Sequence, residues 1–317
     1  YVFIDEVQYA DEGGKKLKYI YDTENVKLII SGSSSAEISI QSLKYLVGRI
    51  YVFNLLPFSF SEFLSARNED LIKIYEKKRF GEEINKRLLK YVNEFLIFGG
   101  YPRVVLSEDE EEKRRTLQNI FNTLILREVR DLFGVASNDN FVKLLKVLAA
   151  QIGNIINYAE LCAVTGIKLP ELKRYFSILE ELYILKRCYP FAKNKRTEIV
   201  KAPKIYFIDY GLRNVILDNF SAERPDKGAL YENLIFAEYL KNEKELKYWR
   251  TKSGAEVDFI DDEIPIEIKT VPKTGKSLRS FITKYSPETA YIVSEREQES
   301  VNINGITVRF LPFSKFI

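Results

Sequence analysis

The distribution of apolar residues predicts strands that alternate with helices at the start of the chain. Tyr1 to Ile4 is an apolar run without alternation, which indicates a strand buried on both faces. Val26 to Ile30 is a second such run, and residues 50–54 predict a third strand. Helices are expected near residues 13–22 and 36–46. This alternation predicts an α/β domain with a parallel sheet.

Helical spacing dominates the following residues. Ser59 and Ser61 are candidate helix N-caps, and Glu62 lies three residues after Ser59, as in a capping box. Residues 83–98 have the apolar spacing of a helix and end at a glycine pair, which favours a helix C-cap. The acidic run 108–112 suits a solvated loop or the first turn of a helix. We expect this part to be a helical lid.

The pattern from residue 138 to 208 predicts a winged helix. Helical patterns at 141–151, 158–163 and 170–181 are followed by strand patterns at 184–189 and 204–208. Ten Lys or Arg against four Asp or Glu lie between residues 168 and 204, which suits contacts with nucleic-acid phosphates. The alternative is a packing or oligomerisation module with a solvated basic face. The predicted DNA contacts are Lys168, Lys173, Arg174, Lys193, Lys195 and Arg196.

Acidic and apolar residues alternate along two predicted strands near the C-terminus. The period of two puts Glu256 and Asp258 on one face of the first strand. It likewise puts Glu267 and Lys269 on one face of the second, and a preceding predicted helix carries Glu232. Carboxylates suit Mg²⁺, which is a hard cation. The alternative is an amphipathic hairpin whose polar face meets solvent.

Composition excludes several kinds of chemistry. The chain has 317 residues, a formal net charge of +3 and no His, so His-based acid–base catalysis and His-ligated zinc are excluded. Its two cysteines, Cys162 and Cys188, lie in apolar surroundings and are expected to be free thiols in a reducing cytosol. We find no run of 18 apolar residues, and we expect a cytoplasmic protein without a membrane segment.

Several short motifs occur in an order that resembles one family of AAA+-like P-loop ATPases of archaea and bacteria. These are Asp5-Glu6-Val7-Gln8, Gly32-Ser33-Ser34, Leu46-Val47-Gly48-Arg49, Pro57-Phe58-Ser59-Phe60-Ser61-Glu62-Phe63 and Phe98-Gly99-Gly100-Tyr101-Pro102. The resemblance continues to the C-terminus and implies ATP and Mg²⁺ as cofactors.

The resemblance also implies roles for five residues. Asp5 would hold Mg²⁺ through water, and Glu6 would polarise the attacking water. Ser31 or Ser33 would sense the γ-phosphate, and Arg49 is a candidate charge-stabilising arginine, although a surface role suits Arg49 as well. The phosphate loop G-x-x-x-x-G-K-[ST] is expected upstream of Tyr1. We therefore expect this sequence to correspond to the family without its first strand, loop and following helix.

The acidic C-terminal strands look like the core of PD-(D/E)xK nucleases. That resemblance implies Asp258, Glu267 and Lys269 as catalytic residues, with Glu232, Asp258 and Glu267 as metal ligands. The predicted fold is an N-terminally incomplete P-loop ATPase domain with a helical lid, a winged helix and an α/β nuclease-like domain. Their expected bounds are 1–65, 66–137, 138–208 and 209–317.

These expectations combine into one principal hypothesis and two rivals. The principal hypothesis is an ATP-hydrolysing protein that acts with a DNA-binding winged helix and a nuclease-like domain, with nucleic acid as its expected partner and a homo-oligomer allowed. The first rival is a Mg²⁺-dependent nuclease regulated by the ATPase part. The second is a non-catalytic DNA-binding regulator with a remnant ATPase domain.

Overall fold

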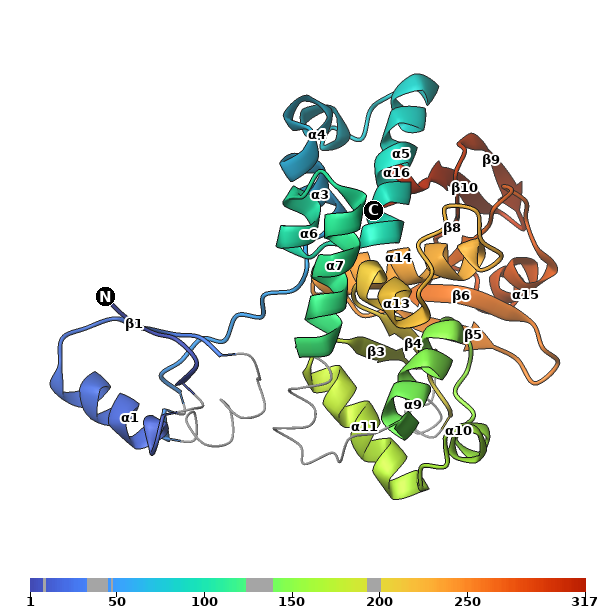
Figure 1. Ribbon diagram of the computed structural model, residues 1–317. Coiled ribbons are helices and arrows are strands. Elements are labelled where there is room, and N and C mark those ends of the chain that lie inside the picture. The colour runs from blue at the N-terminus through green and yellow to red at the C-terminus, as the bar shows by residue number, and fades with distance from the viewer. Residues whose placement is uncertain (8–9, 33–44, 47, 124–138, 193–200) are drawn as a thin grey trace. The chain divides into compact units, whose positions relative to one another are not determined.

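The computed structural model describes residues 1–7, 10–32, 45–46, 48–123, 139–192 and 201–317 (Figure 1). The chain divides into two units, which are described separately. One comprises Tyr1–Leu56 and Lys173–Ile184, and the other comprises Pro57–Leu172 and Leu185–Ile317.

The first unit contains a parallel pair of strands joined by a helix. Strands β1 (Val2–Ile4) and β2 (Leu28–Ile30) pair in parallel, and α1 (Gly13–Thr23) connects them. Val7, Leu17 and Leu46 form a buried cluster against the half-buried sides of both strands. The predicted strand–helix–strand order is confirmed here. A parallel pair needs a crossover connection of this kind.

Two predictions for this unit are wrong. Phe3 is 73% exposed and Ile29 is 41% exposed, so β1 and β2 are buried on one face only. The reason is that the buried cluster packs against the Ile4, Leu28 and Ile30 side of the pair. The third predicted strand, residues 50–54, is irregular. Among the described residues its backbone pairs with no strand, and Tyr51, Val52 and Phe53 are largely exposed. Most of the helix predicted at 36–46 falls on residues outside the described ranges.

Helices begin the second unit, and they have the predicted caps. Ser59 caps α3 (Phe60–Arg67) and completes a capping box with Glu62, whereas Ser61 lies inside the helix and is not its cap. Asp109 caps the helix that carries the acidic run in its first turn. The remaining helices of this group are α4 (Glu69–Tyr75), α5 (Glu82–Phe98), α6 (Pro102–Leu106) and α7 (Glu110–Ile120).

The helix and strand order predicted for residues 138–208 is present. The helices are α9 (Asp139–Ala150), α10 (Tyr158–Thr165) and α11 (Leu169–Glu181). Asn157 caps α10 as expected, because its side chain accepts the Glu160 N–H at 3.2 Å. Strands β3 (Leu185–Cys188) and β4 (Lys204–Phe207) then pair antiparallel. Whether these elements form a winged helix stays a prediction.

A mixed sheet organises the C-terminal part of the second unit. Its strand order is β5-β6-β7-β8-β10-β9. β5, β6 and β7 form an antiparallel meander, and β8 lies parallel to β7 after the crossover helix α15. The elements are α14 (Lys227–Lys241), β5 (Lys247–Arg250), β6 (Glu256–Asp261), β7 (Ile264–Ile268), α15 (Lys276–Tyr285), β8 (Thr289–Ser294), β9 (Gln298–Ile303), β10 (Ile306–Pro312) and α16 (Phe313–Phe316).

The central strand β7 is covered on both faces. Ile266 and Ile268 are buried, as predicted from the period of two, and Glu267 on the opposite face is also buried. α14 and α15 both contact β7. The predicted core positions Val257 and Phe259 of β6 are fully buried as well. On this sheet Glu267 is buried, whereas Glu256 and Asp258 of β6 are half-buried.

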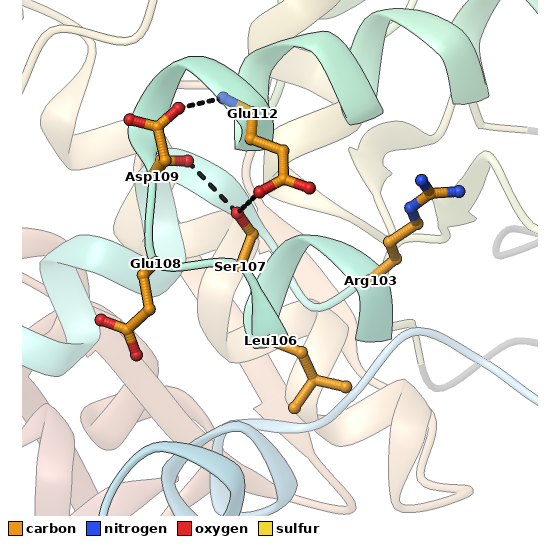
Figure 2. A pocket seen from close by; sticks show the side chains of 6 residues that line it. All are labelled: Arg103, Leu106, Ser107, Glu108, Asp109 and Glu112. Carbon is orange, nitrogen blue, oxygen red and sulfur yellow. Dashed lines mark hydrogen bonds between the residues drawn. The ribbon is translucent and has the colours of Figure 1, made fainter.

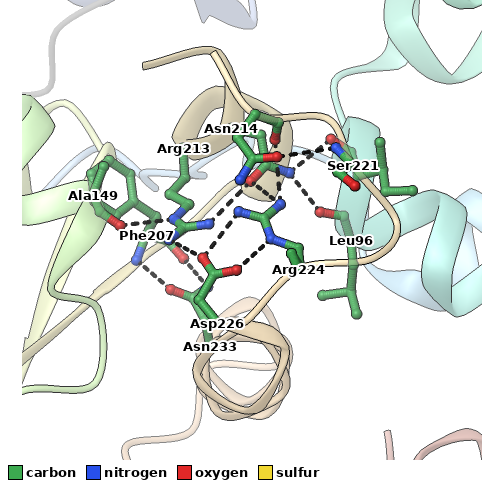
Figure 3. Close-up of polar contacts among 11 residues, drawn as sticks. Leu96, Ala149, Phe207, Arg213, Asn214, Ser221, Arg224, Asp226 and Asn233 are labelled. Atoms are coloured by element: carbon green, nitrogen blue, oxygen red, sulfur yellow. Dashed lines mark hydrogen bonds and ion pairs between the residues drawn. The ribbon is translucent and has the colours of Figure 1, made fainter. Parts of the chain in front are cut away.

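A buried polar network fixes α13 (Tyr210–Leu217) to the elements around it (Figure 3). Arg213 donates to Asp226 Oδ2 at 2.5 Å and to the Ala149 carbonyl at 2.8 Å. Arg224 donates to Asp226 Oδ1 at 2.5 Å. Asn214 donates to the Leu96 carbonyl at 2.8 Å. The start of α14 is thereby tied to α5, α9 and α13.

Two further findings bear on the expectations from composition. Cys162 and Cys188 are free thiols, Cys188 buried and Cys162 half-buried. Among the helices that the structure describes, none combines the length and apolarity needed to cross a membrane.

Candidate functional sites

The ends of β1 and β2 bring Asp5 and Ser31 together. Ser31 N–H donates to the Ile4 carbonyl at 2.9 Å, which continues the parallel pairing one residue beyond the end of β2. The Ser31 hydroxyl donates to Asp5 Oδ1, and the Glu6 N–H donates to the same oxygen at 3.1 Å. The carboxyl ends of parallel strands are where open α/β sheets bind ligands. This is the predicted position for Asp5.

The three other residues predicted to act with Asp5 and Ser31 are Glu6, Arg49 and Ser33. Glu6 has a left-handed backbone with φ of 49°, and it is exposed beside Asp5. Arg49 pairs with Asp22 on α1 and lies 5.5 Å from the centre of the Tyr21 ring. The structure therefore gives Arg49 a contact with α1, and its predicted role towards a nucleotide stays a prediction. Ser33 falls on residues that the structure leaves undescribed.

In the second unit, Asn233 fixes α14 against β4. Its Oδ1 accepts the Phe207 N–H at 2.8 Å, and its Nδ2 donates to the Phe207 carbonyl at 2.7 Å. These two hydrogen bonds place the preceding residue, Glu232, next to the side chains of β4. The Tyr206 hydroxyl donates to Glu232 Oε2 at 3.2 Å. A helix acid is thus held against a neighbouring strand.

Lys204 at the start of β4 reaches into the predicted acidic cluster. Its ammonium lies 2.6 Å from Glu256 Oε1 and 3.8 Å from Glu232 Oε2, and its side chain is 2% exposed. Arg250 makes a second ion pair with Glu256, at 3.3 Å. Sequence reasoning missed Lys204 as a site residue. The available signal was a lysine at the head of the apolar strand pattern 204–208.

Asp258 and Glu267 complete the cluster on the sheet. Asp258 Oδ2 accepts the Ile268 N–H at 2.8 Å, so β7 holds this carboxylate directly. Glu267 is 1% exposed, and its Oε2 is a buried oxygen without a hydrogen-bond partner among the described residues. The Lys269 ammonium lies 3.7 Å from that oxygen. The structure therefore brings the four predicted residues of this site into one region.

Burial sets the electrostatics of the cluster. It raises the pKa of Glu267 to about 7 against the opposing charge of Lys269, and it raises the pKa of Glu232 to about 7 with a further contribution from Asp258. The pKa of Asp258 is also raised by burial. Burial lowers the pKa of Lys204, but Glu232, Asp258 and Glu256 outweigh it and leave that pKa above its usual value. Lys204 therefore stays charged among these acids.

The two sites differ in how well they suit a magnesium ion. Asp5 and Ser31 offer a carboxylate and a hydroxyl, which are hard oxygen donors of the kind that Mg²⁺ takes beside a nucleotide. In the C-terminal cluster, Lys204 holds two of the acids. Within the described ranges, no group of three or more His, Cys, Asp or Glu residues is arranged to hold a metal ion. The C-terminal cluster as it stands does not suit a divalent ion.

Other candidate positions are exposed or lie elsewhere. Lys168, Lys173 and Arg174 are exposed, whereas Lys193, Lys195 and Arg196 fall outside the described residues. An open hollow of about 600 Å³ lies around the cap of α7, and none of the predicted site residues line it (Figure 2). In it Ser107 donates to Glu112 Oε2 at 2.8 Å and Asp109 Oδ2 accepts the Glu112 N–H at 2.7 Å, so these three residues are bonded to one another at the start of α7.

Comparison with known families indicates the class of protein. Residues 1–64 match the sequence model of an AAA domain. Residues 89–223 and 227–316 match two domains of unknown function, DUF8612 and DUF4143. The AAA match at the N-terminus and the DUF4143 match at the C-terminus support an AAA-like ATPase family. The AAA match, over residues 1–64, covers Asp5, Glu6, Ser31 and Arg49.

The curated relatives are themselves described as uncharacterized proteins. One from Methanocaldococcus jannaschii is 28% identical over 267 residues, which cover 82% of this chain and 58% of the relative. One from Haemophilus influenzae is 23% identical over 325 residues, covering 98% of this chain and 76% of the relative. A second M. jannaschii protein is 24% identical over 339 residues, covering 100% of this chain and 70% of the relative. No solved structure matches the chain.

Proposed function

We propose that this chain is part of an ATP-hydrolysing protein of the AAA-like class. The observation that carries the proposal is the hydrogen bond from Ser31 to Asp5, at the carboxyl ends of two adjacent parallel strands. The segment with this geometry is also the one that matches an AAA domain. A fixed carboxylate beside a hydroxyl at that edge is suited to a nucleotide-bound magnesium ion.

Each residue at this edge has a distinct proposed role. Asp5 Oδ1 accepts both the Ser31 hydroxyl and the Glu6 N–H, so Asp5 Oδ2 would hold the ion through water. When bound, Mg²⁺ would neutralise charge on the phosphates. Glu6 would orient the attacking water and take its proton. Ser31 fixes the Asp5 carboxylate and would report the state of the γ-phosphate.

The rival hypothesis of a Mg²⁺-dependent nuclease has less support. The order α14-β5-β6-β7-α15-β8 and the approach of Asp258, Glu267 and Lys269 favour it. Against it, Lys204 lies 2.6 Å from Glu256 and pairs also with Glu232. A buried ammonium among the acids opposes a second cation there. We therefore place the proposed chemistry at Asp5 and Glu6.

ATP hydrolysis by the complete natural protein tests the proposal. Glu6→Gln should lower kcat by about 100-fold or more with little effect on ATP binding, since loss of a general base costs at least that factor. Asp5→Asn should lower both hydrolysis and the dependence of binding on Mg²⁺. The matched controls are Glu24→Gln and Asp11→Asn, which change exposed acids of the same unit.

The controls should hydrolyse ATP at the unaltered rate. Full-rate hydrolysis by Glu6→Gln would sink the assignment of the base. Equal loss in the two control variants would show that the acids act only through stability of the unit.

A further inference from the structure

Lys204 lies where it can balance the charge of three acids of the C-terminal cluster, Glu232, Glu256 and Asp258. Glu256 is 2.6 Å from its ammonium and Glu232 is 3.8 Å from it. The charge of Asp258, together with those of Glu232 and Glu256, raises the pKa of this lysine. The three acids come from β6 and α14, whereas the lysine comes from β4.

The protein builds this position with several contacts. The Asn233 amide locks β4 to α14 through Phe207, two bonds of 2.7 and 2.8 Å. On the other side of the lysine, the Tyr248 hydroxyl donates to the Ala202 carbonyl at 2.7 Å. The Lys204 ammonium lies 5.6 Å from the centre of the Tyr248 ring, within the range of a cation–π contact. The lysine is therefore fixed on both sides.

A divalent ion would need the same oxygens that Lys204 uses. Mg²⁺ and Mn²⁺ are bound by carboxylate oxygens at short range, and a buried ammonium held among those oxygens repels them. Glu267 Oε2 is buried without a hydrogen-bond partner in the described part of the chain, and the Lys269 ammonium lies 3.7 Å from it. The cluster thus has donors for a metal ion, and Lys204 prevents them from acting together.

We propose that Lys204 is the built-in cation of the C-terminal acidic site and excludes divalent metal ions from it. The site is then a metal-free cluster in which the Lys204 ammonium, and not a metal ion, neutralises the charge of the acids. A divalent ion can enter only if β4 withdraws its lysine. The inference is independent of ATP hydrolysis, because Asp5 and Ser31 belong to the other unit.

Mn²⁺ binding to the complete protein tests this exclusion. Lys204→Met replaces the lysine by an unbranched apolar side chain that is one atom shorter, and so removes its charge. It should bind Mn²⁺ at least about tenfold more tightly than the unaltered protein does. Adding Asp258→Asn to Lys204→Met should abolish that gain, whereas Mn²⁺ bound elsewhere is unaffected. Binding is measured as free Mn²⁺ by electron paramagnetic resonance, which needs no activity.

Lys113→Met is the matched control. Lys113 is also a buried lysine in a short ion pair, 2.6 Å from Glu94, and it is not part of the cluster. This variant should gain no Mn²⁺ site. A gain in Lys204→Met but also in Lys113→Met would point to general loosening and overturn the proposal, as would no gain in either.

The unaltered protein supplies a test that does not depend on the folding of the lysine variant. Unaltered protein and Asp258→Asn should bind the same number of Mn²⁺ ions. Asn keeps an oxygen for the Ile268 N–H, so the local bond is preserved. An Mn²⁺ ion that binds the unaltered protein and is lost in Asp258→Asn overturns the exclusion.

Discussion

Lys204 Nζ lies 2.6 Å from Glu256 Oε1 and thereby joins β4 to the first half of the C-terminal sheet. The pair connects the last strand of the predicted winged-helix segment with β6, whose acids had suggested a nuclease-like site. Tyr248 of β5 is bonded to the same segment through the Tyr189 carbonyl, at 3.1 Å. These contacts join β4 and the residue after β3 to the strands β5 and β6 of the C-terminal sheet.

Loss of the Lys204 charge should destabilise this assembly. Removing one partner of a buried ion pair leaves the other uncompensated and costs about 3–5 kcal/mol. Glu232 and Glu256 are 22% and 27% exposed, so water reduces the expected loss for Lys204→Met to about 2–4 kcal/mol. Urea unfolding measures it.

Lys73→Met is the control for that loss. Lys73 pairs with Asp70 at 3.5 Å, and both side chains are largely exposed. Such a pair contributes little, so the unfolding free energy should stay within about 0.5 kcal/mol. Equal midpoints for Lys204→Met and the unaltered protein would contradict the structural role of Lys204.

The sequence predicted local elements well where the pattern is strong. The period of two along residues 256–260 placed Val257 and Phe259 in the core, and the structure confirms both. Ser59 and Asn157 were predicted caps and are caps. These features depend on residues within one turn or one strand, so a local pattern contains them.

Features that depend on distant partners could not be predicted in this way. Residues 50–54 have the apolar pattern of a strand but no strand to pair with in the described chain. The ion pair between Lys204 and Glu256 depends on how β4 packs against α14 through Asn233 and Phe207. No local pattern specifies that packing. The resemblance to a nuclease pointed to the acids, and only the structure shows the lysine among them.

The raised pKa of Glu267 predicts a pH dependence of stability. Burial raises this pKa from 4.5 to about 7, so the folded protein binds the proton more tightly than the unfolded chain does. The contribution of Glu267 to the free energy of unfolding is therefore complete below pH 4.5 and is lost as the pH rises from 4.5 to about 7. At about 1.4 kcal/mol per pH unit, the loss is at most about 3.5 kcal/mol.

Glu267→Gln should remove that loss. Its unfolding free energy should fall less between pH 5 and about 8 than that of the unaltered protein. Urea unfolding at several pH values measures the difference. Parallel curves for the two proteins would contradict the burial of an ionisable carboxyl at this position.

The Asp226 carboxylate should matter in the opposite pH range (Figure 3). Burial raises its pKa, but Arg224 and Arg213 outweigh burial and leave the pKa below its usual value. Its contribution is therefore present above the unfolded pKa of 3.8 and is lost as the pH falls through the lower folded value.

Asp226→Asn should cost about 2–4 kcal/mol at pH 7, because two buried arginines lose their shared partner while Asp226 itself is 27% exposed. Most of the cost should vanish in strong acid, where the unaltered protein has also lost the charge. Asp218→Asn changes an acid just after α13 that forms neither of these two ion pairs, and it serves as control. A cost that is the same at pH 7 and in strong acid would contradict the ion pairs.

Gly211 and Gly228 offer a matched test of how closely α13 packs. A Cβ on Gly211 would lie 2.6 Å from the Phe98 carbonyl carbon, so α13 and the end of α5 approach too closely for any side chain. Gly211→Ala should destabilise the protein by about 1–3 kcal/mol, the usual cost of overpacking.

Gly228, in the first turn of α14, has nothing within 4 Å of its added Cβ. Gly228→Ala should stabilise by up to about 1 kcal/mol, because alanine favours helix. Thermal unfolding compares the two variants, and a raised midpoint for Gly211→Ala would contradict the close contact between α13 and the end of α5.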